Sequence, residues 1–554
     1  MRRSSRWNCR LRVPRSRKAF KGRGLKKDEA EAQWTKSQDY GPRTNVTKTA
    51  IDILSQLQLQ GAKIGGLSAD SRALRAGDAF VAYPGASADG RRYIADAVAR
   101  GAAAVLWERE GFSWDEAWRV PNVAVDGLRG VAGEIAHEVY GRPSEKLWLA
   151  GVTGTNGKTS CSQWIAQALS ALGRKTAVIG TLGSGFPAVP GRELAQQLAP
   201  AANTTPDAIE LHRRLAEFLQ AGAQGVAMEV SSIGLDQGRV NGAQFDVALF
   251  TNFSRDHLDY HGDMERYAAA KARLFDTPGL SGAVLNMDDV LGVRIAQKLA
   301  GSKVACAGYS AHAGVARAAR LEFFLEAENI RLTERGLAFG LVSSWGRAEV
   351  HSRLLGRFNA ANLLGVLGVL LGAGVALEPA VAALAVLTPL PGRMQRLGGA
   401  GKPLAVVDYA HSPDALDVVL MSLRPLAQAS GGRLICVFGC GGDRDRGKRA
   451  LMGAIAVRNA DQVVLTSDNP RSEDPLAIIT DILEGVLGEA HAGQEPQVIV
   501  DRREAIAAAI AGAAAGDVVL IAGKGHEDYQ ESAGRRIPFL DAAVAAEALS
   551  AWTQ

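Results

Sequence analysis

The stretch Gly151-Val152-Thr153-Gly154-Thr155-Asn156-Gly157-Lys158-Thr159-Ser160 decides the fold of this chain. An apolar run, 147–150, enters it, and a helix-compatible run, 161–172, leaves it. A strand, a glycine loop ending in Lys-Thr and a helix together form the arrangement that holds a polyphosphate. Backbone N–H groups of the loop and of the new helix point at the anion, and Lys158 can reach the outer phosphates. Val152 stands where the strict pattern has its first glycine, but the flanking strand and helix favour a phosphate loop over a glycine-rich turn without a ligand.

The composition predicts a multidomain globular protein with a basic extension. The 554 residues are too many for one hydrophobic core, so about three domains are expected. Residues 1–27 hold twelve Lys or Arg and no Asp or Glu, whereas acidic residues outnumber basic ones by seven in the rest of the chain. We therefore expect residues 1–45 to be a basic, disordered extension, with a transit segment or an upstream start codon as alternatives. Nucleic-acid binding by the fold is not indicated.

Membrane insertion and secretion are not indicated either. No apolar run reaches the ~20 residues that a membrane span needs, and the basic segment lacks the apolar core of a secretory signal. The five cysteines show no metal-binding spacing. These features predict a cytoplasmic enzyme with reduced thiols.

Alternating strand and helix patterns predict an α/β protein of three domains. A helical pattern at 49–59 and strands at 77–82 and 103–107 predict a small α/β domain over 46–126. A doubly wound, mostly parallel sheet carrying the phosphate loop is expected in 127–391, with strands at 147–150, 177–179, 225–228, 247–250 and 283–285. A Rossmann-like α/β domain is expected in 392–554, with strands at 404–407, 434–438, 463–466, 498–500 and 518–522. Ligands of such sheets gather beyond the carboxyl ends of the strands.

Polar residues follow several strands of the central domain. Glu229 ends a strand, where a carboxylate could bind Mg²⁺ or cap a helix. The segment Asn203-Thr204-Thr205-Pro206 fits a cap or turn as well as a ligand contact. His257 lies in a loop beside two acids, which favours a site over a structural role, whereas Lys271 by itself is an ordinary helix lysine.

Four polar segments follow strands of the third domain, at 408–413, 439–449, 468–471 and 523–527. The segment 439–449 is a glycine loop with several basic residues before a helix, which predicts anion binding. Four polar segments at strand ends on one edge of a sheet favour a ligand site over solvent-exposed polar residues without a ligand.

The motif G-T-N-G-K-T-S at 154–160 resembles the Mur ligase family and its folylpolyglutamate synthetase relatives, which use ATP to join an amine to a carboxylate. The resemblance continues through D-S-R at 70–72 and D-N-P-R at 468–471 and covers nearly the whole chain after residue 60. It implies the family member that adds the third amino acid of the peptidoglycan stem. The D-N-P-R form implies meso-2,6-diaminopimelate rather than L-lysine, and an arginine fork suits the distal carboxylate that lysine lacks.

The resemblance also implies a role for individual residues, with Lys158, Lys271 and His257 catalytic. ATP would be bound by Gly154, Thr155, Asn156, Gly157, Lys158, Thr159, Ser160, Asn359, Arg393, Asp408 and His411. The UDP-N-acetylmuramoyl dipeptide would be bound by Ala69, Ser71, Ala86, Ser87, Ala88, Asn203, Thr204, Thr205, Ser231, Gln237 and Arg239. Diaminopimelate would be bound by Arg444, Asp468, Asn469, Pro470, Arg471, Gly523 and Glu527.

The mechanism implied by the resemblance activates the D-Glu γ-carboxylate as an acyl phosphate, which the amine then attacks. Two Mg²⁺ ions are expected, one held by Thr159 or Ser160 with Glu229, the other by His257 and by Lys271 as a CO₂-derived carbamate. The carbamate needs a neutral amine, so nearby cations should lower the pKa of Lys271. ATP and amine lie on different domains, which must close to react, and the protein is expected to act as a monomer.

Three alternatives remain at this point. An L-lysine-adding ligase of the same type differs only in the amino-acid pocket. A folylpolyglutamate synthetase-like ligase shares the phosphate loop but should lack D-S-R and D-N-P-R. A nucleotide-driven switch or motor would hydrolyse ATP without any amino acid, and leaves the third domain unexplained.

Overall fold

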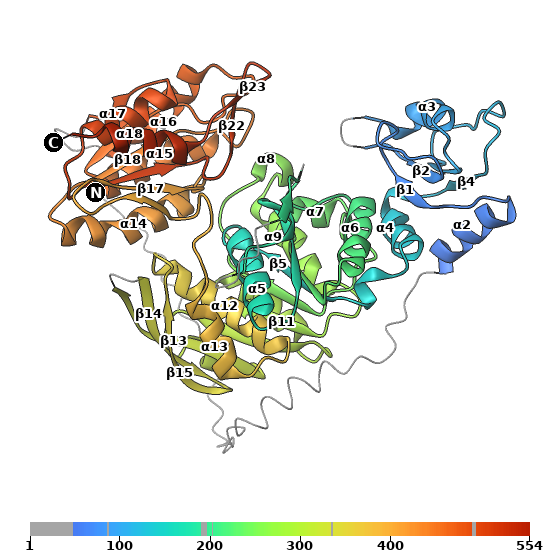
Figure 1. The fold of residues 1–554 in the computed structure, drawn as a ribbon, viewed down its shortest axis with the longest axis horizontal. Helices are drawn as coiled ribbons and strands as arrows, with labels where there is room; N and C mark the ends of the chain where they lie inside the picture. Colours follow the sequence, from blue (N-terminus) through green and yellow to red (C-terminus); the bar gives the residue numbers. More distant parts are fainter. Residues whose placement is uncertain are drawn as a thin grey trace, which may run out of the picture.

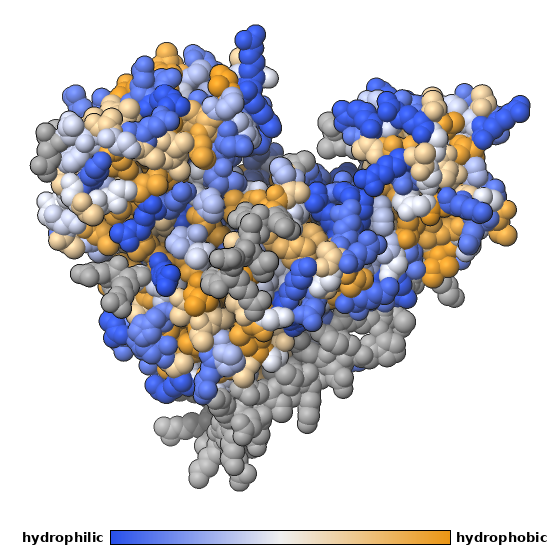
Figure 2. Space-filling model, in the orientation of Figure 1, coloured by the Kyte–Doolittle hydropathy of each residue, from blue (hydrophilic) through white to orange (hydrophobic). Residues whose placement is uncertain are grey.

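The computed structural model describes residues 48–85, 88–189, 197–201, 203–333, 336–489 and 495–553. Their strands form a four-stranded, an eleven-stranded and a six-stranded sheet, with one separate hairpin. Figure 1 shows the N-terminal sheet (blue) and the C-terminal sheet (orange to red) on opposite sides of the large central one. Figure 2 shows that this face is hollowed between the two outer parts. The predicted extension 1–45 and the predicted ligands Ala86 and Ser87 lie outside the described residues.

The N-terminal sheet is entirely parallel, in the order β1-β2-β3-β4. Its strands are β1 (Gly66–Ser68), β2 (Asp78–Ala82), β3 (Ala104–Glu108) and β4 (Asn122–Val125), with helices α2 (Lys48–Leu59), α3 (Ile94–Ala99) and α4 (Leu128–Val139). The predicted helix and both predicted strands are present. Helix α4 packs into the core of this sheet through Leu128, Ile135 and Ala136, and it also contacts α6 of the central domain.

The central sheet has the order β15-β14-β13-β12-β11-β10-β5-β9-β6-β7-β8. Its strands are β5 (Trp148–Thr153), β6 (Thr176–Gly180), β7 (Gly183–Phe186), β8 (Gln197–Ala199), β9 (Gly225–Glu229), β10 (Val247–Phe250), β11 (Gly282–Asn286), β12 (Ala305–Ser310), β13 (Phe323–Thr333), β14 (Gly336–Ser343) and β15 (Gly346–Ser352). Strands β5, β6 and β9 to β13 pair in parallel, and the strands at both ends are antiparallel. The doubly wound, mostly parallel sheet is therefore confirmed, with β5 in its middle.

Helices cover both faces of the central sheet. They are α5 (Lys158–Ala171), α6 (Ala208–Gln220), α7 (Ser232–Asp236), α8 (Leu258–His261), α9 (Met264–Ala272), α10 (Val290–Leu299), α11 (Val315–Ala318), α12 (Phe358–Gly372) and α13 (Leu377–Ala385). Helix α12 is buried along nearly its whole length, between α5, α13 and strands β10 to β13. A helix that is apolar all round is placed inside a core, which explains the long apolar run in this part of the sequence. Of the helices that the structure describes, none is both long and apolar enough to cross a lipid bilayer.

The C-terminal sheet has the order β16-β17-β21-β18-β19-β20, parallel except for β16. Its strands are β16 (Gln395–Gly398), β17 (Leu404–Asp408), β18 (Leu434–Phe438), β19 (Gln462–Leu465), β20 (Gln497–Val498) and β21 (Val518–Ala522), beside the hairpin β22 (Tyr529–Ser532) and β23 (Arg535–Pro538). Its helices are α14 (Pro413–Ala429), α15 (Gly447–Asn459), α16 (Pro475–Glu489), α17 (Arg502–Ala511) and α18 (Asp541–Ala551). Of the strand predicted at 498–500, only Val498 lies in β20, although the Ile499 N–H still donates to the Leu465 carbonyl at 3.0 Å and the Val500 carbonyl accepts from the Ser467 N–H at 3.2 Å. The domain boundaries at 126/127 and 391/392 stay predictions.

Candidate active site

The phosphate loop joins the end of β5 to the start of α5 and needs glycine at two positions. Gly154 has φ +149°, and a methyl group on it would lie 1.9 Å from Thr251 Oγ1. Gly157 has φ +85°, and a methyl group there would lie 2.7 Å from Asn362 Oδ1. Both angles favour glycine, and both contacts leave no room for a side chain. The loop therefore keeps its backbone close to the residues that line the site.

Side chains from the end of β10 hold this loop in shape. The Asn156 N–H donates to Asn252 Oδ1 at 2.8 Å, and Thr251 Oγ1 donates to the Asn156 carbonyl at 2.6 Å. The hydroxyls of Thr155 and Tyr267 hydrogen-bond at 3.2 Å. The sequence pattern assigned no role to Thr251 and Asn252, although their position just after a strand is the signal that marked the other site residues.

Two predicted catalytic lysines meet at the loop. Lys158 Nζ donates to the carbonyls of Gly154 and Thr155, both at 2.9 Å, and Lys271 Nζ donates to the Gly154 carbonyl at 2.8 Å. Lys271 is 1% exposed, and burial, followed by the charge of Lys158, holds its pKa well below the ordinary value. The expected depression of this pKa is present, but burial rather than a nearby cation is its larger cause. A neutral amine at this position fits the uptake of CO₂.

Glu229 binds the loop helix and is not a helix cap. Its Oε2 accepts from Thr159 Oγ1 at 2.9 Å and from Thr181 Oγ1 at 3.1 Å, and its Oε1 accepts from the Thr181 N–H at 2.6 Å. Of the two hydroxyls proposed to accompany Glu229, Thr159 makes the contact, and Ser160 lines the neighbouring cavity. A carboxylate and a hydroxyl side by side at the end of a phosphate loop are oxygen donors of the kind that Mg²⁺ prefers, so these residues fit one such ion. Thr181, at the carboxyl end of β6, was missed from the sequence.

His257 and His411 flank one buried carboxylate, Asp256. His257 Nε2 lies 3.5 Å and His411 Nε2 lies 3.6 Å from Asp256 Oδ2, and His411 comes from the C-terminal domain. Burial lowers the pKa of His257 to about 3, so its ring is neutral near pH 7 and available as a ligand. Burial raises the pKa of Asp256, but the hydrogen bond to His411 together with the charges of His411, His257 and Lys448 holds this pKa well below its usual value. Within the described ranges no three His, Cys, Asp or Glu side chains gather as a metal-holding group.

A cavity of about 310 Å³ lies between the phosphate loop, α12 and α14 of the C-terminal domain. Leu355, Phe358 and Val419 give it apolar walls, with Asn359 and Asn362 as polar groups. This mixture suits a nucleoside base. Six predicted ATP residues line the cavity: Asn156, Gly157, Ser160, Asn359, Arg393 and Asp408.

Arg393 connects this cavity to the loop helix. Its Nη2 donates to Thr159 Oγ1 at 3.1 Å, and its guanidinium lies 4.4 Å from the centre of the Tyr409 ring. The Asp408 carboxylate accepts from the Met394 and Ala410 N–H groups, at 2.7 and 2.9 Å, and so shapes the cavity rim. His411 lies apart from the cavity, facing Asp256.

The residues predicted to bind the dipeptide substrate form a connected patch next to Glu229. Thr205 Oγ1 donates to the Glu229 carbonyl at 3.0 Å and to Ser231 Oγ at 3.0 Å. Arg239 Nη1 donates to the Thr205 carbonyl at 2.9 Å and Arg239 Nε to Gln237 Oε1 at 3.0 Å. Helix α6 is capped by Asp207, so the segment 203–205 is not its cap. Thr204 reaches the same network through Thr181, at 3.0 Å between hydroxyls.

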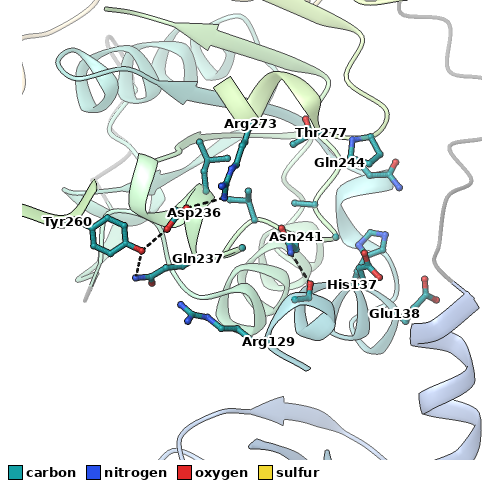
Figure 3. Close-up of a pocket in the computed structure, with 18 residues that line it drawn as sticks. Arg129, His137, Glu138, Asp236, Gln237, Asn241, Gln244, Tyr260, Arg273 and Thr277 are labelled. Atoms are coloured by element: carbon teal, nitrogen blue, oxygen red, sulfur yellow. Dashed lines mark hydrogen bonds and ion pairs between the residues drawn. The ribbon is translucent and has the colours of Figure 1, made fainter. Parts of the chain in front are cut away.

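Three cavities border this patch. One of about 220 Å³ is lined by Asn203, Gln237 and Arg239, and one of about 850 Å³ by Asn203 and Ala69. The third, of about 690 Å³, is drawn in Figure 3, where Gln237 lies beside Tyr260 and Asp236. Gln237 thus separates two cavities.

The remaining predicted nucleotide contacts lie in the N-terminal domain. Ser71 is buried in a turn after β1 and is absent from the lining of the described cavities. Ala88 is exposed, and its carbonyl accepts from the Gly85 N–H at 2.8 Å. The structure therefore brings Ala69 to the substrate patch but gives Ser71 and Ala88 no contact with it.

The D-N-P-R segment forms one cluster with the segment after β21. Asn469 Nδ2 donates to Glu527 Oε2 at 2.7 Å, and Lys524 Nζ donates to both side chains, at 3.1 and 3.0 Å. Gly523 has φ +115°, and a methyl group on it would lie 2.4 Å from Asp468 Oδ2. Lys524, which the sequence left without a role, holds Asn469 and Glu527 together.

Arg471 and Arg444 flank this cluster. Arg471 follows Pro470, has φ +52° and donates through Nη1 to the Gly442 carbonyl at 2.7 Å. A methyl group on Gly441 would lie 2.9 Å from Arg471 Nη1 and 3.8 Å from Arg444 Cγ, so both arginines border Gly441. The predicted diaminopimelate residues therefore share one region.

In the glycine loop 439–449, several basic side chains are already paired with carboxylates, so fewer of them are available to an anion than the sequence suggests. Arg446 and Arg449 both pair with Glu473 at 2.8 Å, and Arg449 also pairs with Asp481 at 2.8 Å. Asp445 of this loop pairs with Arg255 of the central domain at 3.2 Å. This ion pair and the Arg393–Thr159 hydrogen bond bring the two domains together across the site.

Comparisons with known proteins agree with this geometry. Residues 63–140 match the Mur ligase family, catalytic domain, residues 152–370 the Mur ligase middle domain, and residues 392–525 the Mur ligase, glutamate ligase domain. The chain is 50% identical over 505 residues to the UDP-N-acetylmuramoyl-L-alanyl-D-glutamate--2,6-diaminopimelate ligase of Janthinobacterium sp., covering 91% of this chain and 98% of that protein. It is 52% identical over 492 residues to the protein of the same name from Ectopseudomonas mendocina, covering 89% and 96%.

Solved structures extend the likeness to three dimensions. A structure of a UDP-N-acetylmuramoyl-L-alanyl-D-glutamate--2,6-diaminopimelate ligase matches with a TM-score of 0.62 and 38% identity, over 88% of this chain and 95% of that one. A UDP-N-acetylmuramoylalanyl-D-glutamyl-2,6-diaminopimelate--D-alanyl-D-alanyl ligase from Acinetobacter baumannii shares the fold, with a TM-score of 0.58 at 19% identity over 85% and 94%. On the three matched domains and the relatives at about half identity, this chain belongs to the Mur ligase family.

Proposed function

We propose that this chain uses ATP to join meso-2,6-diaminopimelate to the D-Glu γ-carboxylate of UDP-N-acetylmuramoyl-L-Ala-D-Glu, in peptidoglycan synthesis. The curated relatives at about 50% identity are named for this activity, and the alignments cover nearly their whole length. One structural observation supports it most strongly. The phosphate loop and the D-N-P-R cluster lie on different domains, and Arg393–Thr159 and Arg255–Asp445 contacts connect those domains.

The first chemical step would transfer a phosphoryl group to the substrate carboxylate. A carboxylate oxygen attacks the γ-phosphorus, the bond to the bridging oxygen breaks, and ADP leaves an acyl phosphate behind. Lys158 and the N–H groups of the loop would neutralise the developing negative charge. Thr159 with Glu229, and His257 with Lys271 as its carbamate, would hold Mg²⁺, which supplies further charge neutralisation when bound.

The second step would form the amide. The amine nitrogen attacks the acyl carbon, the carbon–oxygen bond to phosphate breaks, and the amine loses a proton. Asn469, Glu527 and Lys524 form a fixed polar group that could position the distal amino-acid head. Arg471 and Arg444 could grip the distal carboxylate in a charge-assisted pair. This last contact favours diaminopimelate over L-lysine, which has no carboxylate there.

The cellular setting follows from these substrates. ATP and a UDP-linked precursor are cytoplasmic molecules, so we infer a cytoplasmic enzyme. The four cysteines in the described ranges are buried and form no disulfide, in keeping with a reducing compartment. We propose that the protein acts as a monomer.

The acyl phosphate can be tested by following oxygen. The substrate γ-carboxylate is labelled with ¹⁸O, the reaction is run with ATP and diaminopimelate, and the released phosphate is examined by mass spectrometry. The proposal requires one ¹⁸O atom in each phosphate, the other staying in the amide carbonyl. Unlabelled phosphate alongside ligated product would overturn this mechanism.

A further inference from the structure

One arginine outside the predicted site lines two cavities and has no acidic partner. Arg129 is the second residue of α4 and is half-buried. It lies on the wall of the cavity of about 220 Å³ and also of the cavity of about 690 Å³, which Figure 3 shows. Within the part of the chain that the structure describes, its side chain makes no hydrogen bond and no ion pair. The guanidinium of Arg129 is therefore available to a ligand in these cavities.

The smaller of the two cavities lies between the N-terminal and central domains, and a second arginine lines it. Its wall includes Tyr83, Gly85 and Arg129 from the N-terminal sheet and its helix α4, and Asn203, Gln237 and Arg239 from the central domain. Arg239 donates to the Thr205 carbonyl at 2.9 Å and to Gln237 Oε1 at 2.7 and 3.0 Å, all neutral acceptors. Two arginines on the wall of one small cavity, neither of them paired with a carboxylate, favour an anion inside it.

The carboxylate on this wall does not neutralise the two arginines. Asp207 caps α6, and its Oδ1 accepts from the Ile209 and Glu210 N–H groups, both at 3.0 Å. In the described ranges no ion pair joins Asp207 to either arginine. The charged side chains of the wall are thus two cations and one carboxylate that is already engaged by its own helix.

The order of groups along the proposed substrate places a diphosphate at this cavity. The uridine is expected at the N-terminal domain, and the D-Glu end is expected beside Glu229, next to the patch that holds Thr205 and Arg239. The diphosphate joins the uridine to the sugar, so it lies between these two ends. On the cavity wall the Gly85 N–H donates to the carbonyl of Ala88, a predicted nucleotide contact, at 2.8 Å. At about 220 Å³ the cavity is smaller than a site for a whole ligand, about 300–1,000 Å³, so it fits one part of the substrate.

We propose that Arg129 binds the diphosphate of the UDP-linked substrate, opposite Arg239. This rests on the proposed function. A guanidinium can donate two parallel hydrogen bonds to phosphate oxygens, and its charge is always present near neutral pH. Because Arg129 belongs to α4 and Arg239 to the central domain, the bound diphosphate connects the two domains. Arg129 makes the same contact before and during the reaction, so it contributes to substrate affinity and not to the chemical step.

The first test compares the kinetics of Arg129→Met with those of Arg119→Met. Arg119 is an exposed arginine of the same domain that lines none of the described cavities, so this control removes an equal charge. Arg129→Met should raise KM for the dipeptide nucleotide about 10–100-fold. Its kcat, and its KM for ATP and for diaminopimelate, should stay within about threefold of wild type. Arg119→Met should leave all of these values within about threefold of wild type.

The second test separates the diphosphate from the rest of the substrate by calorimetry with UDP and with uridine. Wild type should bind UDP more tightly than uridine. Arg129→Met should lose about 10–100-fold in affinity for UDP and less than about threefold for uridine. Arg129→Lys, which keeps the charge but not the two parallel donors, should retain part of the UDP affinity.

Three results would overturn the proposal. They are equal losses for UDP and uridine, unchanged UDP affinity alongside a raised KM, and a wild type that binds UDP no better than uridine. The second of these would instead place Arg129 on a carboxylate of the peptide. Because Arg129 has no partner to lose, the urea midpoint of Arg129→Met should equal that of wild type, and a lowered midpoint would indicate a structural role.

Failure of this inference is distinguishable from failure of the proposed function. If wild type ligates diaminopimelate and Arg129→Met keeps the wild-type KM for the dipeptide nucleotide, only the role of Arg129 is wrong. If wild type releases no ADP with any combination of dipeptide nucleotide and amino acid, the proposed function itself is wrong, and this inference falls with it.

Discussion

Replacing Gly154 by alanine should damage the phosphate loop by an amount that the structure allows us to estimate. At φ +149° an alanine costs about 1–3 kcal/mol in backbone strain. Its methyl group would lie 1.9 Å from Thr251 Oγ1 and 3.0 Å from Asn252 N and O, so overpacking adds about 1–3 kcal/mol. The unfolding free energy should therefore fall by about 2–6 kcal/mol.

Gly173→Ala is the matched control. Gly173 follows the same helix, has φ +91° and has no atom within 4 Å of the added methyl group, so it carries only the backbone cost of about 1–2 kcal/mol. Thr251→Ala provides a second control, because it removes the clashing oxygen. The double variant Gly154→Ala with Thr251→Ala should recover about 0.5–3 kcal/mol relative to the sum of the single changes.

Urea unfolding measures these differences, and ADP release measures their effect on function. The Gly154 carbonyl accepts from Lys158 and from Lys271, so a displaced loop should lose turnover more than Gly173→Ala does. The reasoning is refuted if Gly154→Ala is no less stable than Gly173→Ala and releases ADP at the wild-type rate.

Three other outcomes are expected. Burial lowers the pKa of His212 from 6.5 to about 3, so between these pH values the unfolded chain binds a proton at this histidine and the folded chain does not. The free energy of unfolding should therefore decline as the pH falls below 6.5. Urea titrations of His212→Gln should show a shallower decline with pH than wild type. Asp541→Asn leaves the fully buried Arg502 without its charged partner, so the free energy of unfolding, measured by thermal unfolding, should fall by about 3–5 kcal/mol. The double variant Arg502→Met with Asp541→Leu, which removes both charges, should lose less stability. Arg471→Met should lower kcat/KM for diaminopimelate about 100-fold while changing the rate with L-lysine less than about threefold, and equal losses with both would contradict the assigned contact.

The sequence predicted the strands that end at the site, because their apolar runs are short and each is followed by polar residues. Strands β18 and β21 begin and end at the predicted residues, and β5, β9 and β10 lie where they were expected. The hairpin strands β14 and β15 had no such signal, because they carry no site residues and pair antiparallel at the edge. The short β20 was misplaced for a related reason, since an edge strand is held by one neighbour only.

The pattern of motifs could not show which groups contact one another. The motifs predicted that either Thr159 or Ser160 accompanies Glu229. The geometry of helix α5 directs Thr159 rather than Ser160 toward Glu229, and Thr159 makes the hydrogen bond. The pattern attributed the low pKa of Lys271 to nearby cations, whereas the depth of burial is set by the packing of α9. Thr181 could not be predicted as a site residue, because a single hydroxyl residue after a strand forms no recognisable motif.

The central claim is that a triphosphate on one domain and an amine on the other react with a carboxylate between them. The most direct test measures ADP release with the UDP-N-acetylmuramoyl dipeptide, ATP and either meso-2,6-diaminopimelate or L-lysine. We predict repeated turnover, with more than one ADP released per enzyme, only when both the dipeptide nucleotide and an amino acid are present, with kcat/KM about 100-fold higher for diaminopimelate. Sustained ADP release that needs no amino acid, or that proceeds equally well with L-lysine, would contradict it.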